Sequence, residues 1–420
     1  MAESTKQVTD GERAGGSLAQ RAVDFLGLRR SMVALLTMVV LVGLGEKMAE
    51  RFLPVYLIAL GGSTLSVGLL NGMDNLLSAL YSYPGGYISD RLGYKGALLV
   101  FNLIALLGYL IVILFPTWQM VIVGSIFFIS WTAISLPATM SMVSEVLPST
   151  KRTMGVSIHS LVRRIPMALG PVIGGAFIQI YGRTTGTRIA FSAAFVLGIV
   201  ALVAQQLLIS DQDRAMGRKE AEANPLRALS WMSADLRALL VSDILVRFCE
   251  QIPYAFLAIW ALDHVGITPI QFGTLTAIEM VTAMLVYIPV AYLADRGGKK
   301  PFVVITFVFF TLFPLVLLFS RSMPMLVLAF IIRGLKEFGE PTRKALIMDL
   351  APEGRKAGTF GVYYLLRDVI VSVAAFGGAF LWRMSPATNL LTAFVFGVLG
   401  TLWFLARGRD LGRPSPDVAG

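Results

Sequence analysis

The sequence predicts an all-α membrane protein in which twelve transmembrane helices form two pseudo-symmetric six-helix bundles. Composition is the first reason. Of the 420 residues, 56% are hydrophobic and only 15% are charged, and the mean hydropathy is +0.72. A soluble protein of this length carries roughly a quarter charged residues. The other two reasons are a series of long apolar runs and a repeat that relates the two halves of the chain.

The apolar runs account for the twelve helices. A membrane-spanning helix needs about 20 mostly apolar residues, and each run is close to or above that length. We expect spans near residues 31–58, 65–86, 96–115, 119–145, 155–179, 188–209, 238–262, 269–292, 301–319, 323–349, 358–381 and 387–405.

The polar segments divide the chain into five parts. We expect a tail at 1–30, a six-helix bundle at 31–209, a middle loop at 210–237, a second bundle at 238–405 and a tail at 406–420. Most of the 36 Lys and Arg residues fall in the tails, the middle loop and the even-numbered turns. Lys and Arg gather on the cytoplasmic side of membrane proteins, so both termini are expected in the cytoplasm and the protein in the inner or plasma membrane.

The two bundles resemble each other in sequence. At an offset of 205 positions, Asp74 aligns with Glu279 and Pro84 with Pro289. At 203 positions, the four residues 174–177 repeat as 377–380. Parallel repeats of six helices related by an axis along the membrane normal predict a transporter whose site lies near the midplane, between the halves.

A short polar stretch between the second and third spans is also duplicated. It runs Gly86-Tyr-Ile-Ser-Asp90-Arg91-Leu-Gly93-Tyr-Lys95, and its second copy is Ala291-Tyr-Leu-Ala-Asp295-Arg296-Gly-Gly298-Lys-Lys300. The aspartate suits the positive N-terminus of the following helix, and the basic residues suit the cytoplasmic side.

Ionisable residues inside the predicted spans are the strongest indication of a function. Such groups are costly in a bilayer and usually face a bundle interior or an aqueous cavity. They follow helical spacing, which gives the second, seventh and tenth spans one polar face each. The candidates for proton coupling are Glu46, Glu50, Asp74 and Glu279. The candidates for lining a substrate cavity are Asn71, Asn75, Arg164, Arg247, Glu250, Arg333, Glu337 and Arg367.

Glu46 and Asp74 are the preferred proton carriers. Asp74 has no cation on its own helix, and a poorly paired carboxyl at membrane depth favours its neutral, protonated form. Glu46 lies near the middle of its span.

About half of these charges are expected to form structural ion pairs instead. On their own helices Lys47 can reach Glu50, Arg247 can reach Asp243 and Glu250, and Arg333 can reach Glu337. Arg367 and Asp368 are adjacent, so we expect each to need a partner on another helix. The arginines could contact an anionic substrate or simply pair with these carboxylates.

The duplicated loop has the pattern G-x-x-x-D-R-x-G-x-K, which resembles the signature loop of the major facilitator superfamily of transporters. The resemblance covers about 380 residues, although Ala291 replaces the leading glycine in the second copy. It implies a conformational latch on the cytoplasmic side, formed in two places. The implied latch residues are Gly86, Asp90, Arg91, Gly93, Lys95 and Glu145, with Asp295, Arg296 and Asp349 in the second half.

The fifth span contains Gly170-Pro171-Val-Ile-Gly174-Gly175, which resembles the core of the motif typical of proton-driven exporters in that superfamily. Ser157 and Pro166 stand where that motif has its upstream glycines.

We therefore expect a secondary active transporter that works by alternating access, with proton-coupled efflux of a small organic compound as the leading function. The alternatives are a proton symporter for a polar or anionic metabolite and a non-transporting membrane sensor of the same fold. The chain has no nucleotide-binding G-x-x-x-x-G-K-[ST] loop and no catalytic or metal-ligating cluster. We expect no enzyme activity, no cofactor, no metal and no nucleic-acid partner. The expected partners are a small-molecule substrate, protons and the lipid bilayer, and a monomer suffices for this architecture.

Overall fold

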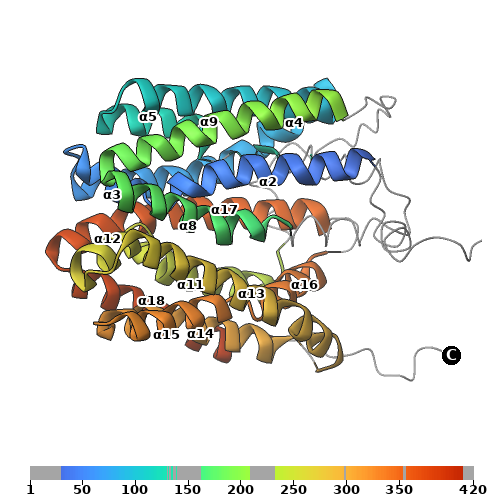
Figure 1. Cartoon of the computed structure of the whole chain (residues 1–420). Coiled ribbons are helices and arrows are strands. Elements are labelled where there is room, and N and C mark those ends of the chain that lie inside the picture. Colours follow the sequence, from blue (N-terminus) through green and yellow to red (C-terminus); the bar gives the residue numbers. More distant parts are fainter. Residues whose placement is uncertain are drawn as a thin grey trace, which may run out of the picture.

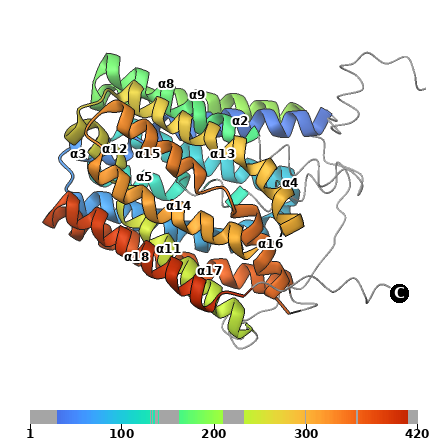
Figure 2. The same ribbon diagram turned by 90° about the horizontal axis from the view of Figure 1, so that it is seen from below.

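The computed structural model describes residues 30–129, 162–208, 232–297, 299–352 and 356–409, together with Trp131, Ile134, Ser135 and Thr139. Within these ranges, every regular element is a helix. The helices lie side by side along one common direction, and the shorter elements α3 and α12 lie at the same end of the bundle, on the left in Figures 1 and 2. We call this the distal end, because α2 begins at the opposite end.

The first half comprises the described helices α2 (Arg30–Glu50), α3 (Leu53–Ala59), α4 (Thr64–Leu114), α5 (Trp118–Phe128), α8 (Arg164–Tyr181) and α9 (Arg183–Leu208). Two of its distal turns end in a residue that caps the next helix. Ser63 accepts a hydrogen bond from the Ser66 amide, and Thr117 accepts one from the Met120 amide. Such caps satisfy amide groups that have no partner inside the helix.

The second half comprises α11 (Ala234–Tyr254), α12 (Leu257–Ile259), a π-helix (Trp260–Val265), α13 (Pro269–Gly297), α14 (Lys300–Phe319), α15 (Met323–Leu335), α16 (Glu340–Leu350), α17 (Lys356–Met384) and α18 (Pro386–Arg407). Ser233 and Ser385 cap α11 and α18 in the same way.

Where the structure describes them, these helices coincide with the predicted apolar runs, but much of the fourth predicted span, 119–145, and the start of the fifth, 155–179, lie outside the described residues. By length and composition, six helices in the described ranges can cross a membrane, or seven if α11 and the bent segment after it form one span. The second and third predicted spans lie in one long helix, α4. Gly93 interrupts this helix, because its backbone angles are not helical, with a φ of 71° and a ψ of 167°. The predicted ten-residue polar turn is therefore mostly helical, and the chain changes direction at a glycine because a positive φ is unfavourable for other residues.

Three predicted spans are broken along their length. The first breaks between α2 and α3, beside Pro54, and the seventh breaks between α11 and α12, just after Pro253. These two breaks are equivalent positions in the sequence repeat. The tenth span breaks between α15 and α16, where Pro341 occupies the first turn of α16. Broken helices leave backbone polar groups unpaired, and membrane proteins tolerate them where they line a cavity.

The halves meet through two long helix pairs, α8 with α13 and α4 with α17. Near the distal end, glycines make these contacts close. A Cβ on Gly273 would meet the backbone of Pro171, and one on Gly68 would meet Ala379. Arg183 and Asp263 form an ion pair across the halves at 2.5 Å. The described residues of the two halves are therefore in tight contact at the distal end.

Gly174 and Gly377 provide a matched test of this packing, because they are equivalent in the repeat. A Cβ on Gly174 would overlap the Met48 carbonyl oxygen of α2, whereas a Cβ on Gly377 would meet nothing within 4 Å. We expect Gly174→Ala to destabilise the protein by about 1–3 kcal/mol, the usual range for overpacking. Gly377→Ala should be neutral or slightly stabilising, because Ala is the better helix former. Thermal unfolding in detergent measures both, and equal stabilities would contradict the α2–α8 contact.

Candidate functional site

An inter-half cavity of about 510 Å³ lies at the two equivalent helix breaks. Glu50 and Arg51 reach it from the end of α2, and Tyr254 reaches it from the end of α11. Asp74 of α4 and Arg333 of α15 complete its charged lining. The remaining lining residues are Leu53, Pro54, Leu70, Asn71, Ile129, Ala255, Leu257, Ala258 and Phe272. The site therefore combines four charged side chains with an apolar wall, between the halves as the sequence predicts.

Several polar contacts cross between the halves beside this cavity. The Arg51 guanidinium donates to the Tyr254 hydroxyl at 2.8 Å. The Asn71 amide donates to the Gln251 carbonyl at 3.1 Å, and the Asn75 amide donates to the Gln251 side chain at 3.2 Å. The predicted cavity residues Asn71 and Asn75 are therefore used as cross-half contacts, and these bonds have to break if the halves separate here.

Among the residues that the structure describes, Asp74 has no ion-pair partner and one hydrogen bond, a long one of 3.5 Å from the Ser78 hydroxyl. Glu50 and Arg51 line the same cavity. The sequence predicted that Asp74 has no cation on its own helix. The structure adds that no neighbouring helix among the described residues supplies one within ion-pair distance.

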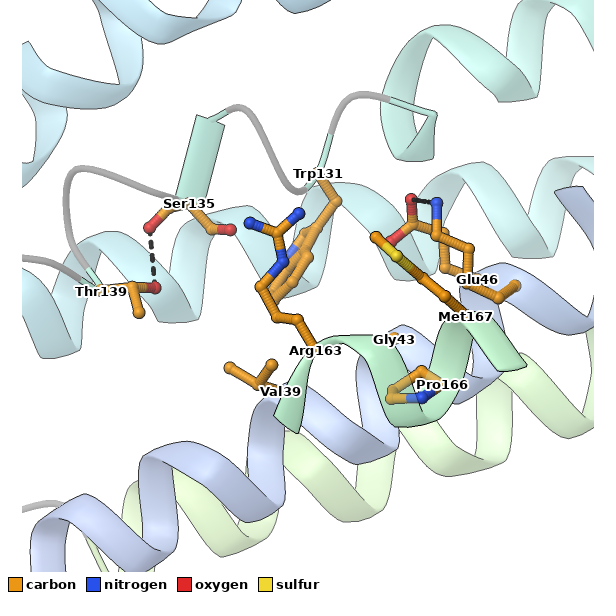
Figure 3. A pocket seen from close by; sticks show the side chains of 10 residues that line it. Val39, Gly43, Glu46, Trp131, Ser135, Thr139, Arg163, Pro166 and Met167 are labelled. Atoms are coloured by element: carbon orange, nitrogen blue, oxygen red, sulfur yellow. Dashed lines mark hydrogen bonds and ion pairs between the residues drawn. The ribbon is translucent and has the colours of Figure 1, made fainter. Parts of the chain in front are cut away.

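A second cavity, of about 410 Å³, lies inside the first half (Figure 3). The side chain of Glu46 enters it from α2. The side chain of Arg163, the residue that directly precedes α8, enters it as well. Glu46 is 4% exposed, and its Oε2 atom has no hydrogen-bond partner among the described residues. The guanidinium of Arg163 forms no hydrogen bond or ion pair with the residues that the structure describes. The other lining residues are Val39, Gly43, Lys47, Trp131, Ser135, Thr139, Pro166 and Met167. We call this space the first-half cavity.

Lys47 connects the two cavities. Its ammonium group lies 3.1 Å from the Oε1 atom of Glu46, and it also contacts a carboxylate oxygen of Glu50. Glu46 and Lys47 line the first-half cavity, whereas Glu50 lines the inter-half cavity. The predicted Lys47–Glu50 ion pair is present, but the same cation also serves Glu46.

Trp131, in the wall of the first-half cavity, is fixed by a chain of buried amide groups. Its indole N–H donates to Asn102 at 2.9 Å, and Asn102 donates to Gln205 at 2.7 Å. Gln205 in turn donates to the Lys95 carbonyl at 2.9 Å. The chain of amides therefore runs from the cavity wall to the duplicated loop. Sequence reasoning missed it, because its members are far apart along the polypeptide.

The charges of α11, α13 and α15 form a network in the second half. Glu250 contacts Arg247 at 2.5 Å and Lys336 at 2.6 Å. Glu279 lies 3.0 Å from Arg333 and 3.6 Å from Lys336. The network therefore ties together predicted cavity residues and one predicted proton carrier, Glu279, as ion pairs.

A second cluster, at Asp243, is buried still deeper. Arg343, one of the largest fully buried side chains, forms an ion pair with Asp243. Tyr363 donates to the same carboxylate at 3.1 Å, and Arg367 lies 3.5 Å from it. Arg343 also contacts Glu340 at 2.7 Å. Sequence reasoning missed Arg343. Arg343 lies three residues after Glu340 and seven residues after Lys336. This spacing predicts that all three side chains lie on one helical face.

Two of the expected pairings were wrong, those of Arg333 with Glu337 and of Arg247 with Asp243, whereas Arg247 does pair with Glu250. Arg333 pairs with Glu279 on another helix, and Glu337 instead pairs with Arg164 across the halves at 3.1 Å. Asp243 forms ion pairs with Arg343 and Arg367. Arg247 forms ion pairs with Glu250 and Glu340 instead.

Adjacent Arg367 and Asp368 were each expected to need a partner on another helix. Arg367 has one in Asp243, at 3.5 Å, but the side chains of Arg367 and Asp368 also meet each other at 2.7 Å. The long arginine side chain turns back along its helix, which spacing arguments based on Cβ positions do not anticipate.

Only part of the implied latch can be compared with the structure. Gly86, Asp90, Glu145, Asp295 and Arg296 lie outside the residues whose side chains the structure describes. Arg91 is exposed, with its guanidinium 4.6 Å from the centre of the Tyr87 ring. Asp349 forms an ion pair with Lys299. No group of three or more His, Cys, Asp or Glu side chains in the described ranges could hold a metal ion.

Comparison with known proteins identifies the family. The model of the Major Facilitator Superfamily matches residues 35–242 and again 239–419. An uncharacterised MFS-type transporter of Methanocaldococcus jannaschii, MJ1317, is 22% identical over 376 residues, covering 86% of this chain and 91% of that protein. The quinolone resistance protein NorA of Staphylococcus aureus is 24% identical over 193 residues, which cover 46% of this chain and 48% of NorA.

A solved structure has the same fold. The peptide transporter POT, in complex with sulfate, superposes with a TM-score of 0.72 at 15% identity, covering 90% of this chain and 93% of POT. The twofold family match and this superposition confirm the predicted fold class of two six-helix bundles.

Proposed function

Because the chain belongs to the major facilitator superfamily of transporters, we propose that it exchanges protons for a small organic compound by alternating access. The observation that carries this proposal is the position of Lys47 between Glu46 and Glu50. These two carboxylates line different cavities. When either of the two carboxylates takes up a proton, the ammonium group that they share keeps only the other carboxylate as a charged partner. Lys47 therefore links the protonation of one cavity to the charge of the other.

Asp74 is the proposed proton carrier of the inter-half cavity. A carboxyl group at membrane depth without an ion pair is readily neutralised by a proton. Asp74 lines the cavity at the helix breaks, which are the parts of the bundle where the halves would have to move. Glu279 is a weaker carrier candidate, because its carboxylate contacts both Arg333 and Lys336.

Glu46 is the proposed carrier of the first-half cavity. One of its oxygens contacts Lys47, and the other has no hydrogen-bond partner in the part of the chain that the structure describes. That open oxygen can accept a proton or a cationic group of a substrate, but not both. Because the proton and the substrate compete for one atom, binding of the substrate releases the proton and binding of the proton releases the substrate. Exchange requires this coupling.

Efflux across the inner or plasma membrane is the proposed direction, with both termini in the cytoplasm. The distribution of Lys and Arg supports this orientation, and the match to a quinolone resistance protein supports export. In this orientation, the distal end faces away from the cytoplasm. Its cross-half contacts, among them Arg183 with Asp263, would hold the transporter closed on that side.

The alternative is symport of a polar or anionic metabolite with protons. Arg51 and Arg333 line the inter-half cavity, and a guanidinium group suits a carboxylate or phosphate. The fold shared with a peptide transporter is compatible with this reading.

Everted membrane vesicles distinguish exchange from symport. Respiration acidifies the vesicle lumen, and a fluorescent amine reports the acidity while a library of small organic compounds is added outside. We expect at least one compound to raise the luminal pH, because protons leave as that compound enters. Further acidification on addition of a compound would indicate symport. A purified protein that moves no solute in liposomes would favour a sensor.

A further inference from the structure

We infer that the first-half cavity binds a small zwitterion, with an ammonium group at Glu46 and an anionic group at Arg163. This inference rests on the proposed function and adds a substrate class to it. The chemistry comes from two groups of opposite charge that enter one cavity from different segments of the chain.

Glu46 provides the site for the cation. Its Oε2 atom is buried and has no hydrogen-bond partner within the described ranges, while Oε1 is held by Lys47. A buried carboxylate oxygen without a donor is costly, because it has lost its water and gained no replacement. An ammonium group of a ligand would supply a charge-assisted hydrogen bond there.

Arg163 provides the site for the anion. Its guanidinium has five N–H donors and forms no hydrogen bond or ion pair with the described part of the chain. The neighbouring Arg164 differs, because it is committed to Glu337. Arginine presents paired donors that match a carboxylate or a phosphate. Arg163 is therefore the cation of this cavity that a ligand anion can engage.

The rest of the lining indicates an apolar or aromatic ligand body. Trp131, Val39, Met167 and Pro166 line the same cavity. Trp131 is only 5% exposed, and its indole is held by Asn102, so the ring is a fixed wall. Rigid aromatic walls of this kind favour flat or aromatic ligand groups.

A set of three matched compounds tests this inference on the full-length protein in detergent or nanodiscs. Phenylalanine carries both charges, phenethylamine carries only the ammonium group, and 3-phenylpropionate carries only the carboxylate. The dipeptide alanyl-phenylalanine extends the distance between the charges. We expect one of the two zwitterions to bind at least about tenfold more tightly than either singly charged compound, because the zwitterion makes one more charge-assisted hydrogen bond than either of them.

Two substitutions assign the charges. Arg163→Gln should weaken binding of that zwitterion to the level of phenethylamine and leave phenethylamine itself unchanged. Glu46→Gln should weaken it to the level of 3-phenylpropionate. Arg188→Gln is the matched control, because Arg188 is an exposed arginine of the same half that bonds the Ile113 carbonyl. Isothermal titration calorimetry measures each affinity.

The inference is overturned if neither zwitterion binds, if all probes bind equally, or if Arg163→Gln has no more effect than Arg188→Gln. These results are independent of the vesicle assay. Charge-independent binding with intact proton exchange would reject the zwitterion and retain the proposed function. Charge-selective binding without proton exchange would retain the zwitterion and reject exchange.

Discussion

Asp74→Asn is expected to reduce proton exchange in everted vesicles to the level of vesicles that lack the protein. The amide has nearly the same shape as the carboxyl group but carries no exchangeable acidic proton. Because Asp74 has no ion pair among the described residues, little structure depends on its charge. The expected loss is therefore a loss of coupling with the fold intact.

Asp235→Asn is the control for this experiment. Asp235 lies in the first turn of α11, and its carboxylate is 3.9 Å from exposed Arg409. Its substitution should leave proton exchange unchanged, because surface ion pairs contribute little. Exchange at the unmodified rate in Asp74→Asn vesicles would contradict the assignment of Asp74 as a proton carrier.

Asp243→Ala is expected to have the largest effect on stability, a loss of about 3–5 kcal/mol in the free energy of unfolding. The carboxylate is 1% exposed and has Arg343, Arg367 and Tyr363 as partners. Its removal leaves buried Arg343 with Glu340 as its one remaining ion-pair partner among the described residues, and Glu340 also pairs with Lys344 and Arg247. A buried charge that loses its main partner is far more costly than the loss of the pair as a whole.

A double substitution checks this reason. Asp243→Leu combined with Arg343→Met removes both charges, so it should be more stable than Asp243→Ala alone. Unfolding in mixed micelles of increasing denaturing detergent measures each variant. A loss in Asp243→Ala no larger than that in Asp235→Asn would show that the cluster contributes no stability.

The fold could be predicted because its signals are local. Apolar runs indicated the helices, and the structure places Pro54 and Pro253 beside two of the breaks that shape the inter-half cavity. The pairing of charges could be predicted only where both partners share a helix, as with Lys47 and Glu50. The pairs of Glu279 with Arg333 and of Asp243 with Arg343 join different helices.

Side-chain spacing along one helix carries no information about neighbours on another helix. Sequence reasoning therefore identified Glu46 and Asp74 as unusual, but it could not assign them to separate cavities. It also could not show that Lys47 connects those cavities, because that depends on which helices of the two halves pack around the end of α2.

The most direct test of the central claim is a count of protons released when a substrate binds to the purified protein in weakly buffered solution. The substrate is a compound that raises luminal pH in the vesicle assay. We expect binding to release protons from the unmodified protein, and Glu46→Gln to release fewer, because substrate and proton compete for Glu46. Binding without proton release, or with proton uptake, would contradict exchange at these carboxylates.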